Sequence, residues 1–141
     1  VFLFLSLYIY ENNGGVGLAV ALHYKMTLRL WKEEKVFGPG ILSLMQLIDR
    51  LGSLQKAAAE MGLAYSKAWK IIKTAEHTLG FALIERSIGG KNGGGSTLTC
   101  RGRALMEQYL AFEQDAQEAV TMLFQKYFGG EEENEGRNTV L

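Results

Sequence analysis

Three glycines, Gly52, Gly62 and Gly80, divide the middle of the chain into short segments with helical patterns. The first segment follows Pro39, and proline suits the first turn of a helix. Its apolar residues recur at the i, i+3, i+4, i+7 spacing of one helical face, at Ile41, Leu44, Met45, Ile48 and Leu51. Glycine readily ends a helix because it adopts left-handed backbone angles without steric cost. The pattern predicts a helix, a short helix, a tight turn and a third helix.

The second and third helices differ in the side chains that they carry. Ser53 is a good N-cap for the second helix, and the alanines at 57–59 would let another helix approach closely. The third helix runs to about Leu79, with an apolar face at Ala68, Ile72, Ala75 and Leu79. Its opposite face carries Ser66, Lys67, Lys70 and Lys73. Hydroxyl and ammonium donors therefore face outward.

Short strands are predicted at residues 27–31, 81–87 and 96–100, and the last two flank a glycine-rich stretch. Glycines supply the positive φ values of a hairpin turn. A phosphate-binding loop would need its lysine after the glycines, at the start of a helix. Here Lys91 precedes the glycines at 93–95, and a strand follows them. We therefore expect the tip of a hairpin and not a nucleotide-binding enzyme.

A long helix is predicted from residue 100 to 128. Its apolar residues step by 4, 3, 4, 3 and 4, at Leu105, Tyr109, Phe112, Ala116, Ala119 and Leu123. About 25 helical residues extend about 40 Å, which is longer than so small a domain. We expect this face to pair with a second copy of the chain; the alternative is that the helix folds back on its own domain.

The two ends of the sequence differ from the middle. The first ten residues form an apolar run too short to span a bilayer, and a coherent pattern begins at Met26. We expect residues 1–25 to be a non-native or disordered leader, with a membrane-associating leader as the alternative. Residues 26–99 would form the main domain and 100–128 the long helix. Residues 129–141 are acidic and predicted to be disordered.

The net charge of zero hides an asymmetry. Residues 27–103 contain twelve Lys/Arg against six Asp/Glu, whereas residues 104–141 contain two against eight. This distribution fits a polyanion as the partner of the main domain, or a solvated surface without a partner. The single cysteine, Cys100, fits a reducing compartment and hence a cytoplasmic location. Two distant histidines and one cysteine give no basis for a metal or other cofactor.

The order of these elements is that of a winged helix-turn-helix, a mainly α fold with a small β-hairpin, here extended by the long helix. In this fold the third helix presents its polar face to the DNA major groove. Ser53 and Gln55 can offer donors to a phosphate at the start of the second helix.

The sequence also resembles a known family over residues 27–128. "GSLQKAAAEMGLAYSKAWKIIKTAEHTLGFALIER", followed by "GGKNGGGSTLTCRGRAL", is similar to the DNA-binding domain of the molybdate-responsive ModE-like regulators. It resembles the same region of LysR-type regulators more distantly. The most specific pieces are "AYSKAWKII", the "GG-x-x-GGG" wing and "LT-x-x-G-x-x-L" at the start of the long helix.

The resemblance implies a homodimeric transcriptional regulator that reads a palindromic site in double-stranded DNA. The DNA contacts implied in the third helix are Tyr65, Ser66, Lys67 and Lys70. Arg86, Lys91 and Asn92 would meet phosphates or the minor groove. Tyr65 has an alternative role as a helix-cap aromatic, and we favour packing against the wing for Trp69. Lys73 fits a solvated or phosphate-contacting lysine better than a base reader.

One departure from the family limits what is carried over. ModE-like regulators have oxyanion-binding domains after the long helix; we expect no oxyanion-binding domain in this chain, and oxyanion sensing is not carried over. The alternative function is a winged-helix protein-interaction module that does not bind DNA. No membrane partner is expected.

Overall fold

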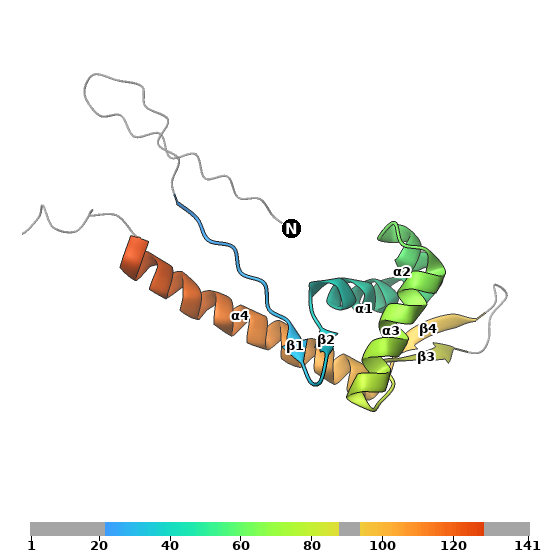
Figure 1. Cartoon of the computed structure of the whole chain (residues 1–141). Coiled ribbons are helices and arrows are strands. Elements are labelled where there is room, and N and C mark those ends of the chain that lie inside the picture. Colours follow the sequence, from blue (N-terminus) through green and yellow to red (C-terminus); the bar gives the residue numbers. More distant parts are fainter. Residues whose placement is uncertain (1–21, 88–93, 129–141) are drawn as a thin grey trace, which may run out of the picture. The chain divides into compact units, whose positions relative to one another are not determined.

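The computed structural model describes residues 22–87 and 94–128 (Figure 1). The chain separates into two units, residues 27–118 and a second unit whose described residues are 22–26 and 119–128. Lys91 and Asn92, most of the expected leader and the acidic end lie outside the described residues. Within the described residues, no helix is both long and apolar enough to cross a membrane.

The first unit contains the three short helices that the sequence predicts: α1 (Pro39–Leu51), α2 (Leu54–Glu60) and α3 (Tyr65–Leu79). Gly52 and Gly80 end α1 and α3 with left-handed φ values of 67° and 81°. Ser53 caps α2, because its Oγ accepts a hydrogen bond from the Lys56 N–H at 3.2 Å. The predicted ends of α1 at Gly52 and of α3 at Gly80 are confirmed.

Two antiparallel hairpins complete this unit. In the second, β3 (Ile84–Ser87) pairs with β4 (Gly95–Leu98), so that Ile84 lies opposite Leu98 and Ser87 opposite Gly95. This hairpin projects beside α2 and α3 and forms the wing (Figure 1). Both strands are shorter than predicted: Ala82 and Leu83, before β3, accept hydrogen bonds from Thr99, which follows β4 and precedes the long helix.

The first hairpin was only half predicted. β1 (Leu30–Trp31) lies within the predicted strand at 27–31, but its partner β2 (Lys35–Phe37) was missed. The turn between β1 and β2 is hydrogen-bonded to the end of α3. Lys32 Nζ donates to the Thr78 carbonyl at 3.1 Å, and the Thr78 hydroxyl donates to Glu34 at 2.9 Å. A cation at the last carbonyls of a helix complements the helix dipole.

The core of this unit lies between the three helices, the bases of both hairpins and the first turns of the long helix. It includes Leu44, Met45, Ile48, Ile72 and Leu83, all of which are fully buried. Ala57 and Ala58 are buried as well, which fits the close approach of α2 expected from small side chains. Seven of the nine apolar positions predicted for α1 and α3 are therefore buried in this core, and the other two, Leu51 and Leu79, are half-buried.

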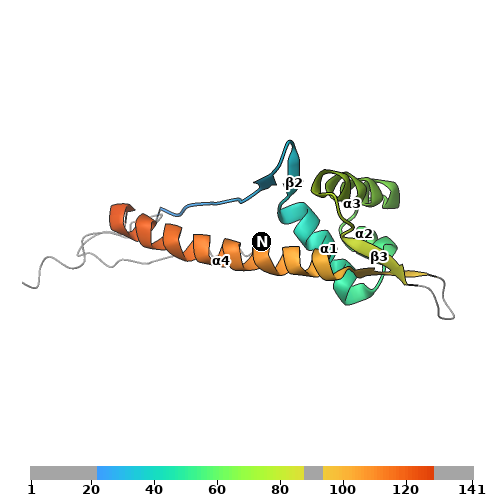
Figure 2. The same ribbon diagram turned by 90° about the horizontal axis from the view of Figure 1, so that it is seen from below.

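The long helix, α4 (Cys100–Phe128), begins at a threonine cap. Thr99 Oγ1 accepts from the Gly102 N–H at 2.9 Å and donates to the Ala82 carbonyl at 2.7 Å. A side chain at Gly102 would overlap the carbonyl group of Leu83, with its Cβ 2.9 Å from the carbonyl carbon. This close approach explains the "LT-x-x-G" part of the motif. Figure 2 shows the end of α1 beside the start of α4. There the two terminal guanidinium nitrogens of Arg103 donate to the carboxylate of Asp49.

The predicted pairing face of α4 needs a correction at Tyr109. Its side chain is only 1% exposed, its hydroxyl donates to the Leu28 carbonyl at 2.9 Å, and its ring lies 5.0 Å from that of Phe37. Leu105 is half-buried against the same core. The first turns of α4 therefore fold back on their own domain, which was the alternative interpretation. Phe112 remains 51% exposed.

The second unit has its own small set of contacts. Tyr24 lies against the last turns of α4, where its hydroxyl is 2.6 Å from Thr121 Oγ1 and its ring is 5.1 Å from that of Phe124. The ring of Phe124 is in turn 5.3 Å from that of Phe128. Leu123, predicted for the pairing face, is 52% exposed.

Candidate nucleic-acid interface

Helix α3 exposes the polar face that its sequence predicts. Ser66, Lys67 and Lys70 are all exposed, while Ala68 and Ile72 on the other face are buried in the core. Tyr65, the first residue of the helix, is 45% exposed. The first half of α3 therefore offers two ammonium groups and two hydroxyls to the outside.

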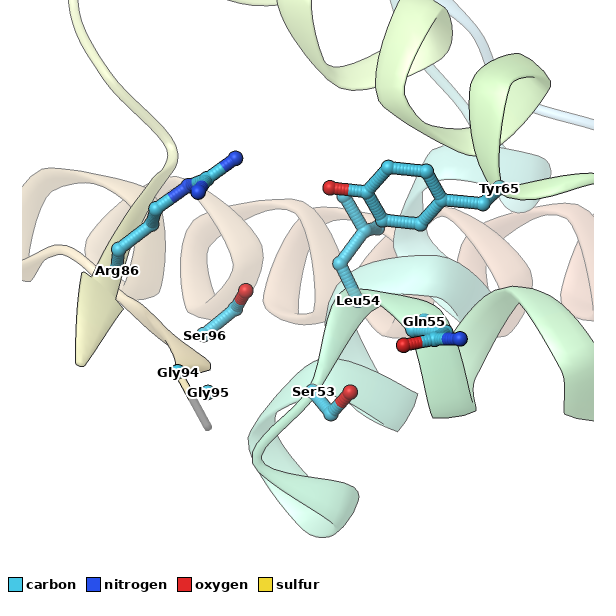
Figure 3. Close-up of a pocket in the computed structure, with 8 residues that line it drawn as sticks. All are labelled: Ser53, Leu54, Gln55, Tyr65, Arg86, Gly94, Gly95 and Ser96. Carbon is cyan, nitrogen blue, oxygen red and sulfur yellow. The ribbon is translucent and has the colours of Figure 1, made fainter. Parts of the chain in front are cut away.

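A polar hollow of about 170 Å³ lies next to this helix. Three parts of the fold line it: the start of α2, the start of α3 and the two strands of the wing. The lining residues are Ser53, Leu54, Gln55, Tyr65, Arg86, Gly94, Gly95 and Ser96. Figure 3 shows the Arg86 guanidinium and the Tyr65 hydroxyl pointing into the space between the wing and α3. Four residues predicted to contact DNA, Ser53, Gln55, Tyr65 and Arg86, are thus brought together.

The hollow depends on a close contact between the wing and the turn after α1. The Ser96 N–H donates to the Gly52 carbonyl at 2.9 Å. A Cβ at Gly95 would lie 2.5 Å from the same oxygen, so this position needs a residue without a side chain. Ser96 is buried, and its hydroxyl is directed toward the hollow (Figure 3). The sequence reasoning missed Ser96, because only the fold places it opposite Ser53.

An aromatic and cationic cluster joins α3 to the wing. The rings of Tyr65 and Trp69 stack with centroids 6.3 Å apart. The guanidinium of Arg86 lies 5.4 Å from the Trp69 ring, and the ammonium of Lys73 lies 4.6 Å from it. Trp69 is half-buried, and its contact with Arg86 agrees with the expectation that it packs against the wing.

Lys73 is placed differently from the other lysines of α3. Its ammonium lies 2.7 Å from Glu76 Oε2 and forms an ion pair. Glu76 is buried and did not stand out in the sequence, because a single glutamate near a helix end is ordinary there. Within residues 22–87 and 94–128, no group of three His, Cys, Asp or Glu side chains is arranged to hold a metal ion.

The interface is rich in hydrogen-bond donors of the kind that bind phosphate. Arginine and lysine carry a permanent positive charge at neutral pH, and hydroxyl groups can donate beside them. The exposed first half of α3 is flanked by the hollow, so cationic and hydroxyl groups line a continuous surface from the helix to the wing. A polyanion fits this surface better than a small neutral ligand does.

Comparisons with known proteins agree with this geometry. Residues 41–103 match the family described as bacterial regulatory helix-turn-helix protein, lysR family. The chain is 35% identical over 99 residues to the DNA-binding transcriptional dual regulator ModE of Escherichia coli (strain K12), covering 70% of this chain and 37% of that protein. It is 35% identical over 85 residues to the molybdenum transport protein ModE of Azotobacter vinelandii, covering 60% and 32%.

Among solved structures, the CbnR_DBD-DNA complex aligns with a TM-score of 0.47 and 21% identity, over 61% of this chain and 93% of that one. The chain spans about a third of the length of the curated relatives named above. The resemblance predicted from the sequence is confirmed. Over residues 41–103 the chain is similar to the regulatory helix-turn-helix proteins of the lysR family, and over 99 residues it is similar to a ModE transcriptional regulator.

Proposed function

We propose that the protein is a sequence-specific, DNA-binding transcriptional regulator that acts as a homodimer. Residues 26–99 would bind DNA and residues 100–128 would pair two copies. Helix α3 would enter the major groove, and the wing would meet the backbone or the minor groove. The E. coli relative is named as a transcriptional regulator, which fits the expectation that this chain is not an enzyme.

The observation that carries the proposal is the gathering of predicted DNA contacts around one hollow. Ser53, Tyr65 and Arg86 come from three different elements and line the same polar space. Contacts to phosphate fix the register of a protein on the duplex, while contacts to base edges specify the sequence. We assign the hollow to the backbone, and Ser66, Lys67 and Lys70 to the groove.

We also assign DNA contacts to the tip of the wing. Lys91 and Asn92 lie outside the described residues, and we propose that they meet phosphates or the minor groove, as the resemblance implies. A cytoplasmic location, expected from the single cysteine, stays a prediction.

The pairing of two copies is proposed through the part of α4 that follows the core. Phe112 and Leu123 are about half exposed, and Ala116 and Ala119 fall between them at heptad-like spacing. Large apolar side chains left exposed on a helix favour a protein interface. The face proposed for pairing therefore begins at Phe112, after the turns that belong to the core.

Salt-dependent DNA binding tests the proposal. A binding site is first selected from random duplexes, and its affinity is then measured by fluorescence anisotropy between 50 and 200 mM salt. Each phosphate contact should contribute about −0.9 to the slope of log K against log salt. We expect Lys67→Ala to weaken binding to the selected duplex more than binding to a scrambled duplex. Lys91→Ala should weaken binding to both duplexes equally. Lys35→Ala removes the same charge from the exposed first residue of β2 and should change neither affinity.

A protein-interaction module that does not bind DNA is the competing function. It would give no salt-sensitive binding to any duplex, including the selected pool, together with a tight complex with another protein. That pair of results would overturn the regulator assignment. Equal losses on both duplexes for Lys67→Ala would leave DNA binding intact and move Lys67 from the bases to the backbone.

A further inference from the structure

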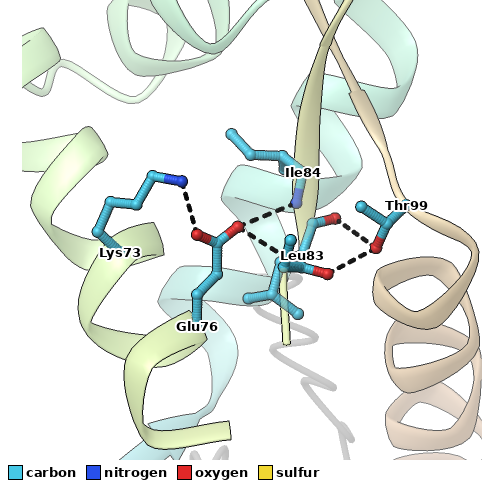
Figure 4. A network of polar contacts seen from close by, with 6 residues as sticks. Lys73, Glu76, Leu83, Ile84 and Thr99 are labelled. Carbon is cyan, nitrogen blue, oxygen red and sulfur yellow. Dashed lines mark hydrogen bonds and ion pairs between the residues drawn. The ribbon is translucent and has the colours of Figure 1, made fainter. Parts of the chain in front are cut away.

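Glu76 is a buried carboxylate that holds the base of the wing. Glu76 is 9% exposed, and its Oε1 accepts hydrogen bonds from the backbone N–H groups of Leu83 at 2.8 Å and Ile84 at 3.2 Å (Figure 4). Ile84 is the first residue of β3. A carboxylate bound by two backbone donors in a buried position has little freedom to move.

The second oxygen of the same carboxylate binds Lys73. The Lys73 Nζ to Glu76 Oε2 distance is 2.7 Å, and the two residues are three apart on α3. The ammonium also lies over the Trp69 ring, which Arg86 approaches as well. Lys73 is thus held by a fixed anion and an aromatic face, whereas none of the ion pairs among the described residues involves Lys67 or Lys70.

We propose that Glu76 is a positioning residue that withholds the Lys73 ammonium from the DNA backbone. This inference rests on the proposed DNA-binding function and changes what α3 offers to DNA. Contacts to phosphate strengthen binding to every sequence alike, while base contacts distinguish sequences. A neutralised Lys73 leaves α3 with one fewer sequence-independent contact, so binding to every sequence is weaker and depends less on salt.

Glu76→Gln separates the two roles of the side chain. Glutamine keeps an oxygen that can accept from Leu83 and Ile84, but its NH₂ group would face the Lys73 ammonium, and two donors do not bind each other. Lys73 would then be free to reach a phosphate. Glu33→Gln is the matched control, because it removes the same charge from the exposed turn between β1 and β2.

The measurement is the salt slope of binding to the selected duplex and to a scrambled duplex of the same length. We expect Glu76→Gln to steepen the slope by about 0.9. The affinity of the variant relative to that of the parent protein should therefore change by about threefold between 50 and 200 mM salt. The affinity for the scrambled duplex should rise at low salt. Adding Lys73→Met to Glu76→Gln should return the slope to that of the parent protein, and Glu33→Gln should leave it unchanged.

Three results would count against the inference. An unchanged slope in a folded Glu76→Gln protein overturns it, as does a steeper slope that persists after Lys73→Met is added. If Glu76→Gln does not fold, Lys73→Met alone decides: an unchanged slope supports the inference, and a loss of about 0.9 shows that Lys73 already contacts phosphate. Absence of salt-dependent binding in the parent protein would instead remove the proposed function itself.

Discussion

Gly95 and Gly102 are required by packing and not by their backbone angles. Neither has a φ value in the left-handed region, yet a Cβ at Gly95 would collide with the Gly52 carbonyl and one at Gly102 with that of Leu83. Such a requirement is invisible in a local sequence pattern, because the colliding atoms belong to distant segments. Gly52 and Gly80, whose angles end helices, were predicted correctly for the opposite reason: a helix end is a local property.

The packing role of Gly102 gives a prediction at this scale. Gly102→Ala should lower the free energy of unfolding by about 1–3 kcal/mol, as expected when a well-packed site is overfilled. Gly40→Ala is the control, because Gly40 is also helical and has no atom within 4 Å of an added Cβ. It should be neutral or stabilising by up to about 1 kcal/mol. Urea denaturation measures both, and equal effects would show that the Leu83 contact does not matter.

At the scale of elements, the sequence predicts a helix better than it predicts what the helix contacts. The heptad-like spacing through Tyr109 is the same whether that face meets a second copy or its own core. Whether this face meets its own core depends on the position of Leu28 and Phe37, and these residues belong to another part of the chain. The first hairpin was half missed for a related reason, since strands of two and three residues carry too little alternation to be detected.

The contact between α1 and α4 predicts a dependence of stability on pH. The hydrogen bonds from Arg103 hold the pKa of Asp49 below its ordinary value of 3.8. A carboxylate with a lowered pKa in the folded state stabilises the fold above its unfolded pKa, and this contribution is lost as the pH falls through the folded value. The parent protein should therefore be more stable than Asp49→Asn at pH 6, and the difference should vanish in strong acid.

Chemical denaturation at a series of pH values from 6 to 2 measures this difference. Asp115→Asn is the control, because Asp115 is exposed on α4 and takes part in none of the ion pairs among the described residues. A gap between parent and Asp49→Asn that stays constant with pH would mean that the ion pair contributes no linkage to folding.

At the scale of the whole molecule, four of the eight residues that line the hollow had been predicted as DNA contacts, but their grouping around one space had not. Ser53, Tyr65 and Arg86 were assigned from helix starts and from a family resemblance, without any indication that they surround one space. Ser96 and Glu76 were missed, because a buried polar side chain is recognised by its partners and not by its neighbours in sequence. A grouping of this kind depends on contacts between distant segments.

The proposed pairing of two copies is tested by charge. Phe112→Glu and Leu123→Glu should each shift the mass in sedimentation toward that of a single chain, because a buried carboxylate without a partner is costly. Gln125→Glu adds the same charge to an exposed position outside the heptad-like spacing and should leave the mass unchanged. A dimer that survives both substitutions would place the contact elsewhere on the protein.

The peptide unit between Leu83 and Ile84 gives the domain a mechanical property. Its N–H, that of Ile84, donates to Glu76 Oε1 of α3 at 3.2 Å, and its carbonyl, that of Leu83, accepts from the Thr99 N–H at 3.0 Å, immediately before α4. One rigid, planar group therefore connects the helix proposed to read DNA to the helix proposed to pair two copies. A twist of the first turns of α4 would be transmitted to α3 through two hydrogen bonds in series.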